Sequence, residues 1–252
     1  IGVLAGILSG LLGIGGGVVT IPCLLIVFRW IGIIPSEMMH LAIGTSLAAM
    51  VFSTLSSSYY HKKKKAIDFK IVKPMGIGVI FGAVLGAFIT NLLPSNFLQV
   101  FFGGFECLLG VRFLFPKLMP YKERPLPSSR ILAGISLIVA TLSTMLGIGG
   151  GLINVPILTA FSVPVKRAIG TSSALSFLIA VCGAVAFLLF GVKSSPITDA
   201  VGFIYLPAFI LISVFAFLFA PLGVKWAHDL PINVLKRIFG VVLLIAGISI
   251  IL

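Results

Sequence analysis

The sequence predicts an all-α integral membrane protein. Three observations support this prediction: the composition, the long apolar segments and the glycine runs. The 252-residue chain is 59% hydrophobic and only 10% charged, and its mean hydropathy is +1.24. Soluble domains are about 45–50% apolar and about 25% charged, so a soluble globular domain is excluded. Intrinsic disorder is excluded as well, because such a chain cannot leave this much apolar surface in water.

Six segments have the roughly 20 mostly apolar residues that a transmembrane helix needs. They are residues 37–60, 71–90, 96–115, 165–190, 200–221 and 232–252. Two further apolar segments, 1–28 and 131–161, are interrupted at residues 13–17 and 147–151, which both read GIGGG. Because glycine leaves helical geometry at little steric cost, we expect the helix to stop at each run.

The two interruptions belong to an internal repeat. Each GIGGG run follows a Leu-Ser pair and precedes a proline, and each half also carries the sequence AIGTS, at 42–46 and 168–172. We therefore expect two pseudo-symmetric membrane repeats, residues 1–118 and 128–252, each with one Gly-broken segment and three transmembrane helices. Residues 119–127, in a Pro-rich and charged stretch, are expected to form a cytoplasmic linker.

The broken segments either span the membrane as discontinuous helices or re-enter as hairpins, and the positive charges discriminate between these alternatives. If both segments span, 12 Lys and Arg residues lie on one face and 6 on the other; if both re-enter, the division is 16 to 2. Cytoplasmic loops collect positive charge, so the larger asymmetry favours hairpins. Hairpins also make the halves inverted repeats, a common plan among secondary transporters.

The glycine runs point to an anion site. Non-helical backbone at membrane depth must be buried in protein or line a polar cavity. A new half-helix is expected to begin after each run, with free N–H groups and about half a positive charge at its tip. Two such tips that converge would bind an anion without a buried cation. The alternative is that the glycines only allow close helix crossings.

Hydroxyl groups of the second shared motif are expected at a similar depth. Thr45 and Ser46 lie about nine residues into their helix if Ser36 caps it, and their counterparts lie about seven residues into theirs. These hydroxyls either donate to an oxyanion or bond back to their own helix carbonyls. The candidate substrate-binding residues are Gly13, Gly15, Gly16, Gly17, Thr20, Thr45, Ser46, Gly147, Gly149, Gly150, Gly151, Asn154, Thr171 and Ser172.

Glu106 is the only acidic residue deep inside a predicted span. A charge at the bilayer centre costs about 2.5–3.5 kcal/mol on insertion scales, so this residue needs an explanation. It is a candidate proton carrier; alternatively it is a protonated acid hydrogen-bonded between helices, or a partner of Arg112.

Other chemistry is not expected. The three cysteines and three histidines lack metal-ligand spacing, and no cluster of His, Asp, Glu or Cys predicts a catalytic site, a metal or a cofactor. The net charge of +12 is interrupted by apolar runs, so we expect a basic rim rather than nucleic-acid binding. Residues 62–65, all lysine, are expected to contact anionic lipid at the cytoplasmic face.

The paired GIGGG runs, each trailed by a Gly-Thr-Ser helix, resemble the TauE/SafE-type sulfite and sulfonate exporter family. The resemblance covers essentially the whole chain. It implies transport of a small sulfur-containing anion such as sulfite, thiosulfate or an organosulfonate like sulfoacetate, with the Gly runs and the Gly-Thr-Ser motifs forming the site.

We therefore expect a secondary transporter of the cytoplasmic (inner) membrane, with several transmembrane passes, that exports the anion by alternating access around a midplane site. Two alternatives remain: an anion channel, and a membrane-embedded subunit of a larger complex. Neither the anion, nor proton coupling, nor the oligomeric state follows from the sequence.

Overall fold

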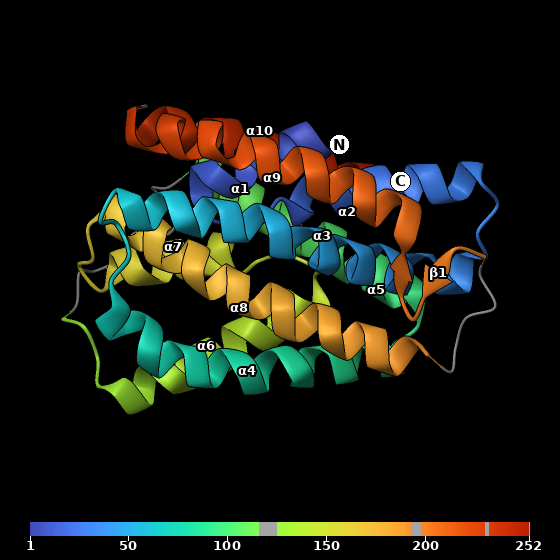
Figure 1. Ribbon diagram of the computed structural model, residues 1–252, viewed down its shortest axis with the longest axis horizontal. Helices are drawn as coiled ribbons and strands as arrows, with labels where there is room; N and C mark the ends of the chain where they lie inside the picture. The colour runs from blue at the N-terminus through green and yellow to red at the C-terminus, as the bar shows by residue number, and fades with distance from the viewer. Residues whose placement is uncertain (116–124, 193–197, 230–231, 252) are drawn as a thin grey trace.

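The computed structural model describes residues 1–115, 125–192, 198–229 and 232–251. Within these ranges the helices are α1 (Gly2–Leu12), α2 (Gly17–Trp30), α3 (Pro35–Lys63), α4 (Phe69–Leu92), α5 (Ser95–Leu114), α6 (Ser129–Met145), α7 (Gly151–Ala160), α8 (Val165–Gly191), α9 (Leu206–Asp229) and α10 (Ile232–Ile251). Strands β1 (Ala200–Val201) and β2 (Ile204–Tyr205) form a short antiparallel hairpin. The long helices lie along the longest axis of the molecule (Figure 1).

The prediction of an all-α integral membrane protein is confirmed. Helices α3, α4, α5, α8 and α9 are long and apolar enough to cross a bilayer. In the sixth predicted span, the described part of α10 contributes a shorter apolar stretch, Gly240–Ile250. The prediction was wrong about the start of the fifth span, because the β1–β2 hairpin occupies residues 200–205 and α9 begins only at Leu206.

The helix stops at both glycine runs, as predicted. In the first half α1 ends at Leu12 and α2 begins at Gly17; in the second half α6 ends at Met145 and α7 begins at Gly151. The residues that cap α2 and α7, Gly16 and Gly150, have φ angles of 85° and 75°. This left-handed conformation strains any residue with a Cβ, so glycine is needed at both caps.

The long helices define two ends of the molecule. At the lysine end, on the left in Figure 1, α3 finishes, α4 and α8 begin, and α9 finishes; the Lys166 ammonium there donates to the carbonyl of His228 over 2.9 Å. At the distal end α3 and α5 begin together, and the amide of Met39 donates to the hydroxyl of Ser95 over 3.1 Å. Among the described Lys and Arg residues, only Arg29 lies at the distal end.

Each broken segment folds back as a hairpin. Helix α6 runs parallel to α4 from the lysine end into the molecule, and α7 returns to the lysine end, where residues 161–164 connect it to α8 (Figure 1). Helix α1 instead runs along α9 toward the lysine end, and α2 returns to the distal end, where residues 31–34 connect it to α3. The two hairpins therefore point in opposite directions.

Small residues let the first arm of each hairpin pack closely on a helix of the other half. Helix α1 packs on α9 through glycines spaced four residues apart, and α6 packs on α4 in the same way. The facing glycines are Gly2, Gly6 and Gly10 on α1, and Gly78, Gly82 and Gly86 on α4. Such small-residue stripes bring helix backbones together in membranes, where packing replaces the hydrophobic effect. The central helices α3 and α8 pack on each other between these pairs.

Candidate functional site

The two glycine loops, residues 13–17 and 147–151, contact each other inside the molecule. The amide of Gly149 donates to the carbonyl of Ile14 over 2.9 Å. A Cβ on Gly17 would clash with the carbonyl of Gly147, and one on Gly151 would lie 2.6 Å from the carbonyl of Gly13. The tips of α2 and α7 therefore meet through backbone alone, which we call the glycine junction.

Serine hydroxyls on the central helices hold the glycine junction. Ser46 of α3 donates to the carbonyl of Gly147 over 3.0 Å. Ser53, also of α3, donates to the carbonyl of Gly15 over 3.1 Å. Ser176 of α8 donates to the carbonyl of Gly13 over 2.6 Å and also contacts the carbonyl of Gly149. These hydroxyls satisfy carbonyl groups that the broken helices leave without partners, so they fix the loops in place.

The threonines of the two AIGTS motifs, Thr45 and Thr171, make equivalent hydrogen bonds. Thr45 accepts a hydrogen bond from the amide of Tyr205, in the connection that leads into α9, over 2.9 Å. Thr171 accepts one from the amide of Asp68, in the connection that leads into α4, over 3.0 Å. Each threonine thus anchors a loop of the opposite half. The start of α3 also differs from the expectation: Pro35 is its first residue, and Ser36 does not cap it.

Several buried polar side chains near the junction have no hydrogen-bond partner in the described residues. Ser143, Thr144, Asn154 and Ser172 are at most 1% exposed, and both the oxygen and the nitrogen of the Asn154 amide are unpaired. Thr20, the counterpart of Asn154, differs, because its hydroxyl donates to the carbonyl of Gly16 over 3.0 Å. Apart from Ser9, the unpaired polar side chains near the glycine loops therefore lie in the second half.

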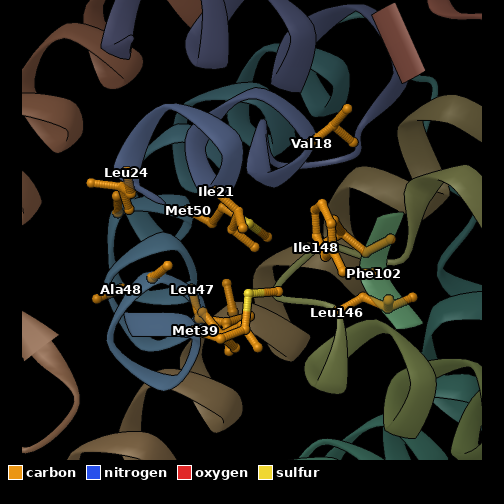
Figure 2. Close-up of a cluster of buried hydrophobic side chains, with 14 of the residues drawn as sticks. Val18, Ile21, Leu24, Met39, Leu47, Ala48, Met50, Phe102, Leu146 and Ile148 are labelled. Atoms are coloured by element: carbon orange, nitrogen blue, oxygen red, sulfur yellow. The ribbon is translucent and has the colours of Figure 1, made fainter. Parts of the chain in front are cut away.

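Met50 of α3 fills the space between the two loops. A Cβ on Gly149 would lie 3.0 Å from the Met50 methyl group, and one on Gly15 would lie 2.5 Å from it. Figure 2 shows Met50 close to Ile21 and directed, with it, toward Ile148 across the core. All three side chains are fully or almost fully buried. The junction is closed by an unbranched, flexible side chain.

Glu106 is a buried acid in the membrane-spanning helix α5. It is in α5, which packs along α10 and touches α3, whereas the junction lies between α3 and α8. Its side chain is 1% exposed, and neither carboxyl oxygen has a hydrogen-bond partner among the described residues.

A groove of about 740 Å³ lies elsewhere, between α1, α2, α9 and α10. Its lining is almost entirely apolar and includes Leu4, Val19 and Ile245. Leu4 and Ile245 are 56% and 65% exposed, so the groove opens on a surface that lipid would cover. Among its described lining residues only Cys23, Trp226 and Ser249 carry a donor group, too few to surround an anion.

The sequence prediction missed four residues of this region: Met50, Ser53, Ser143 and Ser176. Two signals were available. Met50 and Ser176 each follow a Gly-Thr-Ser motif by one helical turn, which places them on the same helix face as Ser46 and Ser172. Ser143 belongs to the Leu-Ser pair that precedes each glycine run.

Comparison with known proteins places the chain in a family. The family model described as sulfite exporter TauE/SafE matches residues 1–250. A probable membrane transporter protein of Haemophilus influenzae is 31% identical over 258 residues, covering 99% of this chain and 95% of that protein. One of Methanocaldococcus jannaschii is 27% identical over 257 residues, covering 100% and 93%. The protein YunE of Bacillus subtilis, also a probable membrane transporter, is 29% identical over 214 residues, covering 76% and 77%.

No solved structure matches the chain significantly. The family match and the relatives agree with the apolar helices and the paired glycine hairpins, and neither points to an enzyme. The chain belongs to the TauE/SafE sulfite exporter family and is a multi-pass membrane transporter.

Proposed function

We propose that the protein is a secondary transporter that exports a small sulfur-containing oxyanion, such as sulfite, thiosulfate or an organosulfonate like sulfoacetate, across the cytoplasmic (inner) membrane. The observation that carries this proposal is the glycine junction, where the N-termini of α2 and α7 enter from opposite ends and meet. The first amides of each half-helix have no helical acceptor, and each tip carries about half a positive charge. Such tips bind anions in soluble proteins and in transporters with broken helices.

The proposed substrate site consists of the two glycine loops with the polar groups of α3, α7 and α8 around them. Thr20 of α2 lies beside the first loop, but its hydroxyl is already bonded to the carbonyl of Gly16. The side chains and the backbone have different roles in this site. Ser46 and Ser176 hold the loops, Thr45 and Thr171 hold the connections that lead into α9 and α4, and the backbone amides face the anion. The side chains with unpaired donors, Asn154 and Ser172, supply further hydrogen bonds.

We propose that the halves are inverted repeats that rock against each other. The opposite directions of the hairpins support this, as do the exchanged contacts in which α1 packs on α9 and α6 packs on α4. In the proposed division, repeats 1–118 and 128–252 are joined by the linker 119–127, of which residues 119–124 lie outside the described residues. Transport requires the junction to open alternately to the two ends, and Met50 must then leave the space between the loops.

The lysine end faces the cytoplasm in this proposal. Positive charge marks cytoplasmic loops, and the lysines there suit anionic lipid headgroups. With the cytoplasm electrically negative, the membrane potential favours exit of one negative charge by about 2.3 kcal/mol per 100 mV. Export of an anion therefore needs no nucleotide and no coupled ion.

Glu106 is the proposed site at which a proton would couple to export. A buried carboxylate without a hydrogen-bond donor is costly, and protonation removes the charge. Helix α5 packs on α3, so coupling would act through the packing of these two helices.

Reconstitution of the purified chain into liposomes tests the proposal. Vesicles loaded with sulfite should take up labelled external sulfite by exchange, and the rate should saturate with concentration. The variant Gly17→Leu, which forces a side chain against the carbonyl of Gly147, should lose exchange, whereas Gly104→Leu, with open space around it, should keep it. A flux that rises linearly without saturation would favour the anion channel, and no flux above protein-free vesicles would refute both.

A further inference from the structure

The two halves of the glycine junction are not equivalent. In the second half, two unpaired polar side chains converge on the cap of α7. The Nδ2 atom of Asn154 and the Oγ atom of Ser143 lie 3.1 and 3.2 Å from the position that a Cβ on Gly150 would occupy. Both residues are at most 1% exposed, so they have lost water as a partner.

The matching position in the first half is closed. Thr20 occupies the place of Asn154, and its hydroxyl donates a hydrogen bond to the carbonyl of Gly16. The space beside Gly16 is filled by the backbone of Ala5, whose carbonyl oxygen lies 2.5 Å from the position of a Cβ there. Ser9, the counterpart of Ser143, is unpaired but has no amide side chain opposite it. The donors of the junction therefore gather on one side.

We infer that Ser143, Asn154 and the first amides of α7 form one oxyanion subsite, in the second half only, which selects monovalent over divalent oxyanions. Among the proposed substrates it therefore favours hydrogen sulfite and singly charged sulfonates over the dianions thiosulfate and sulfoacetate. This inference rests on the proposed function, because it assumes that the carried solute is an oxyanion. A buried donor left without a partner costs about 1–3 kcal/mol, and an oxyanion that accepts from the Nδ2 group of Asn154 would remove that cost. The Asn154 amide, the Ser143 hydroxyl and the α7 backbone amides are all donors that suit sulfonate or hydrogen sulfite oxygens.

The selection for a single charge follows from the neutral donors. No Lys or Arg is among the buried side chains of the described ranges. The helix tip supplies only about half a unit of positive charge, so a second negative charge would be buried without compensation. The flexible Ile179 side chain, whose Cδ1 lies 2.7 Å from the Cβ position at Gly150, is the apolar neighbour that must move to admit the ligand.

Binding to the purified full chain in detergent tests the subsite with two probes, methanesulfonate as the monovalent anion and sulfate as the divalent one. We expect methanesulfonate to bind and sulfate to bind at least about tenfold more weakly. Asn154→Ala and Ser143→Ala should each weaken methanesulfonate binding by about tenfold or more, the usual loss for a hydrogen bond to a charged group. Thr20→Ala, the matched change in the first half, should leave binding within about twofold of the wild type.

The inference is overturned if both second-half variants fold and bind methanesulfonate as the wild type does, if Thr20→Ala weakens binding equally, or if sulfate binds as tightly. A thermal unfolding curve without ligand shows whether each variant is folded, and Asn154→Ser serves if Asn154→Ala is not. Sulfite exchange in liposomes tests the subsite and the proposed function separately. Wild-type exchange with unchanged binding in the variants refutes the subsite alone, whereas absence of any wild-type exchange refutes the proposed function.

Discussion

Ser46 of α3 donates a hydrogen bond to the carbonyl of Gly147, so a helix of the first half holds the glycine loop of the second. Ser176 of α8 makes the reciprocal bond to the carbonyl of Gly13. The shape of each loop therefore depends on the position of the other half. A relative movement of α3 and α8 must break or exchange these bonds, which links any opening of the molecule to the anion-facing backbone.

The variant Ser176→Ala should destabilise the protein more than the loss of a single hydroxyl group suggests. It leaves the carbonyls of both Gly13 and Gly149 without the donor that they share. Removing a buried partner costs about 1–3 kcal/mol, which lowers the unfolding temperature by roughly 2–4 °C per kcal/mol in a chain of this size. Ser249→Ala is the control, because that exposed hydroxyl bonds only to its own helix at Ala246. Equal unfolding temperatures for both variants in detergent would contradict the role of Ser176.

The variant Gly150→Ala should fold less stably and bind the substrate anion poorly. A left-handed residue with a Cβ costs about 1–2 kcal/mol, and the new methyl group would lie among Ile179, Asn154 and Ser143. Gly134→Ala, in an exposed and open position of α6, should be neutral or slightly stabilising. Thermal unfolding with and without methanesulfonate measures both effects. A ligand-induced shift in Gly150→Ala as large as in the wild type would argue against the cap as a binding element.

The fold could be predicted to a large extent because its signals are local. Apolar length gives the spans, and three consecutive glycines give the helix breaks, since both follow from backbone chemistry within a few residues. The start of α9 was missed, because the apolar residues 200–205 form a hairpin around the left-handed Gly202. Hydropathy cannot distinguish a short buried hairpin from the first turns of a helix.

The site was harder to predict, because hydrogen-bond partners are decided by distant packing. The spacing placed Thr45 and Ser46 near the glycine runs, but it could not tell which hydroxyl meets a loop carbonyl and which meets an amide of another connection. It also could not show that Thr20 bonds back to Gly16 while Asn154 stays unpaired. These differences arise between segments more than 100 residues apart, or from single side chains that break the repeat.

Accessibility labelling should place the hairpins. In a background without native cysteines, a cysteine at Lys166 should react only from the cytoplasmic side, and one at Trp30 only from the opposite side. Both positions are exposed at helix ends, so each should react readily. Membrane-impermeant maleimide applied to oriented vesicles makes the measurement. Labelling of both positions from the same side would contradict a re-entrant α6–α7 hairpin, which lies between them in the chain.

Replacement of Glu106 by glutamine distinguishes a proton-carrying role of this residue from a structural one. Glutamine keeps the shape of the side chain and removes its titration, and neither oxygen of Glu106 has a hydrogen-bond partner to lose. If Glu106 carries a proton, the variant should transport sulfite at a rate that no longer depends on a pH gradient. Exchange measured at several imposed gradients gives the answer, and a pH dependence equal to that of the wild type would remove Glu106 from the mechanism.

Truncation of Met50 should make the glycine junction permeable to anions. The Met50 methyl group closes the space between Gly15 and Gly149, and no polar group replaces it when it is shortened. Met50→Ala should cost about 2–5 kcal/mol of stability as a buried cavity, while it raises passive anion flux because the loops no longer need to expel a side chain. Met50→Leu conserves volume and should change both quantities little. Chloride efflux from liposomes, measured beside unfolding temperature, distinguishes a plug from ordinary core packing: a core residue alone would lower the unfolding temperature in Met50→Ala and leave the flux unchanged.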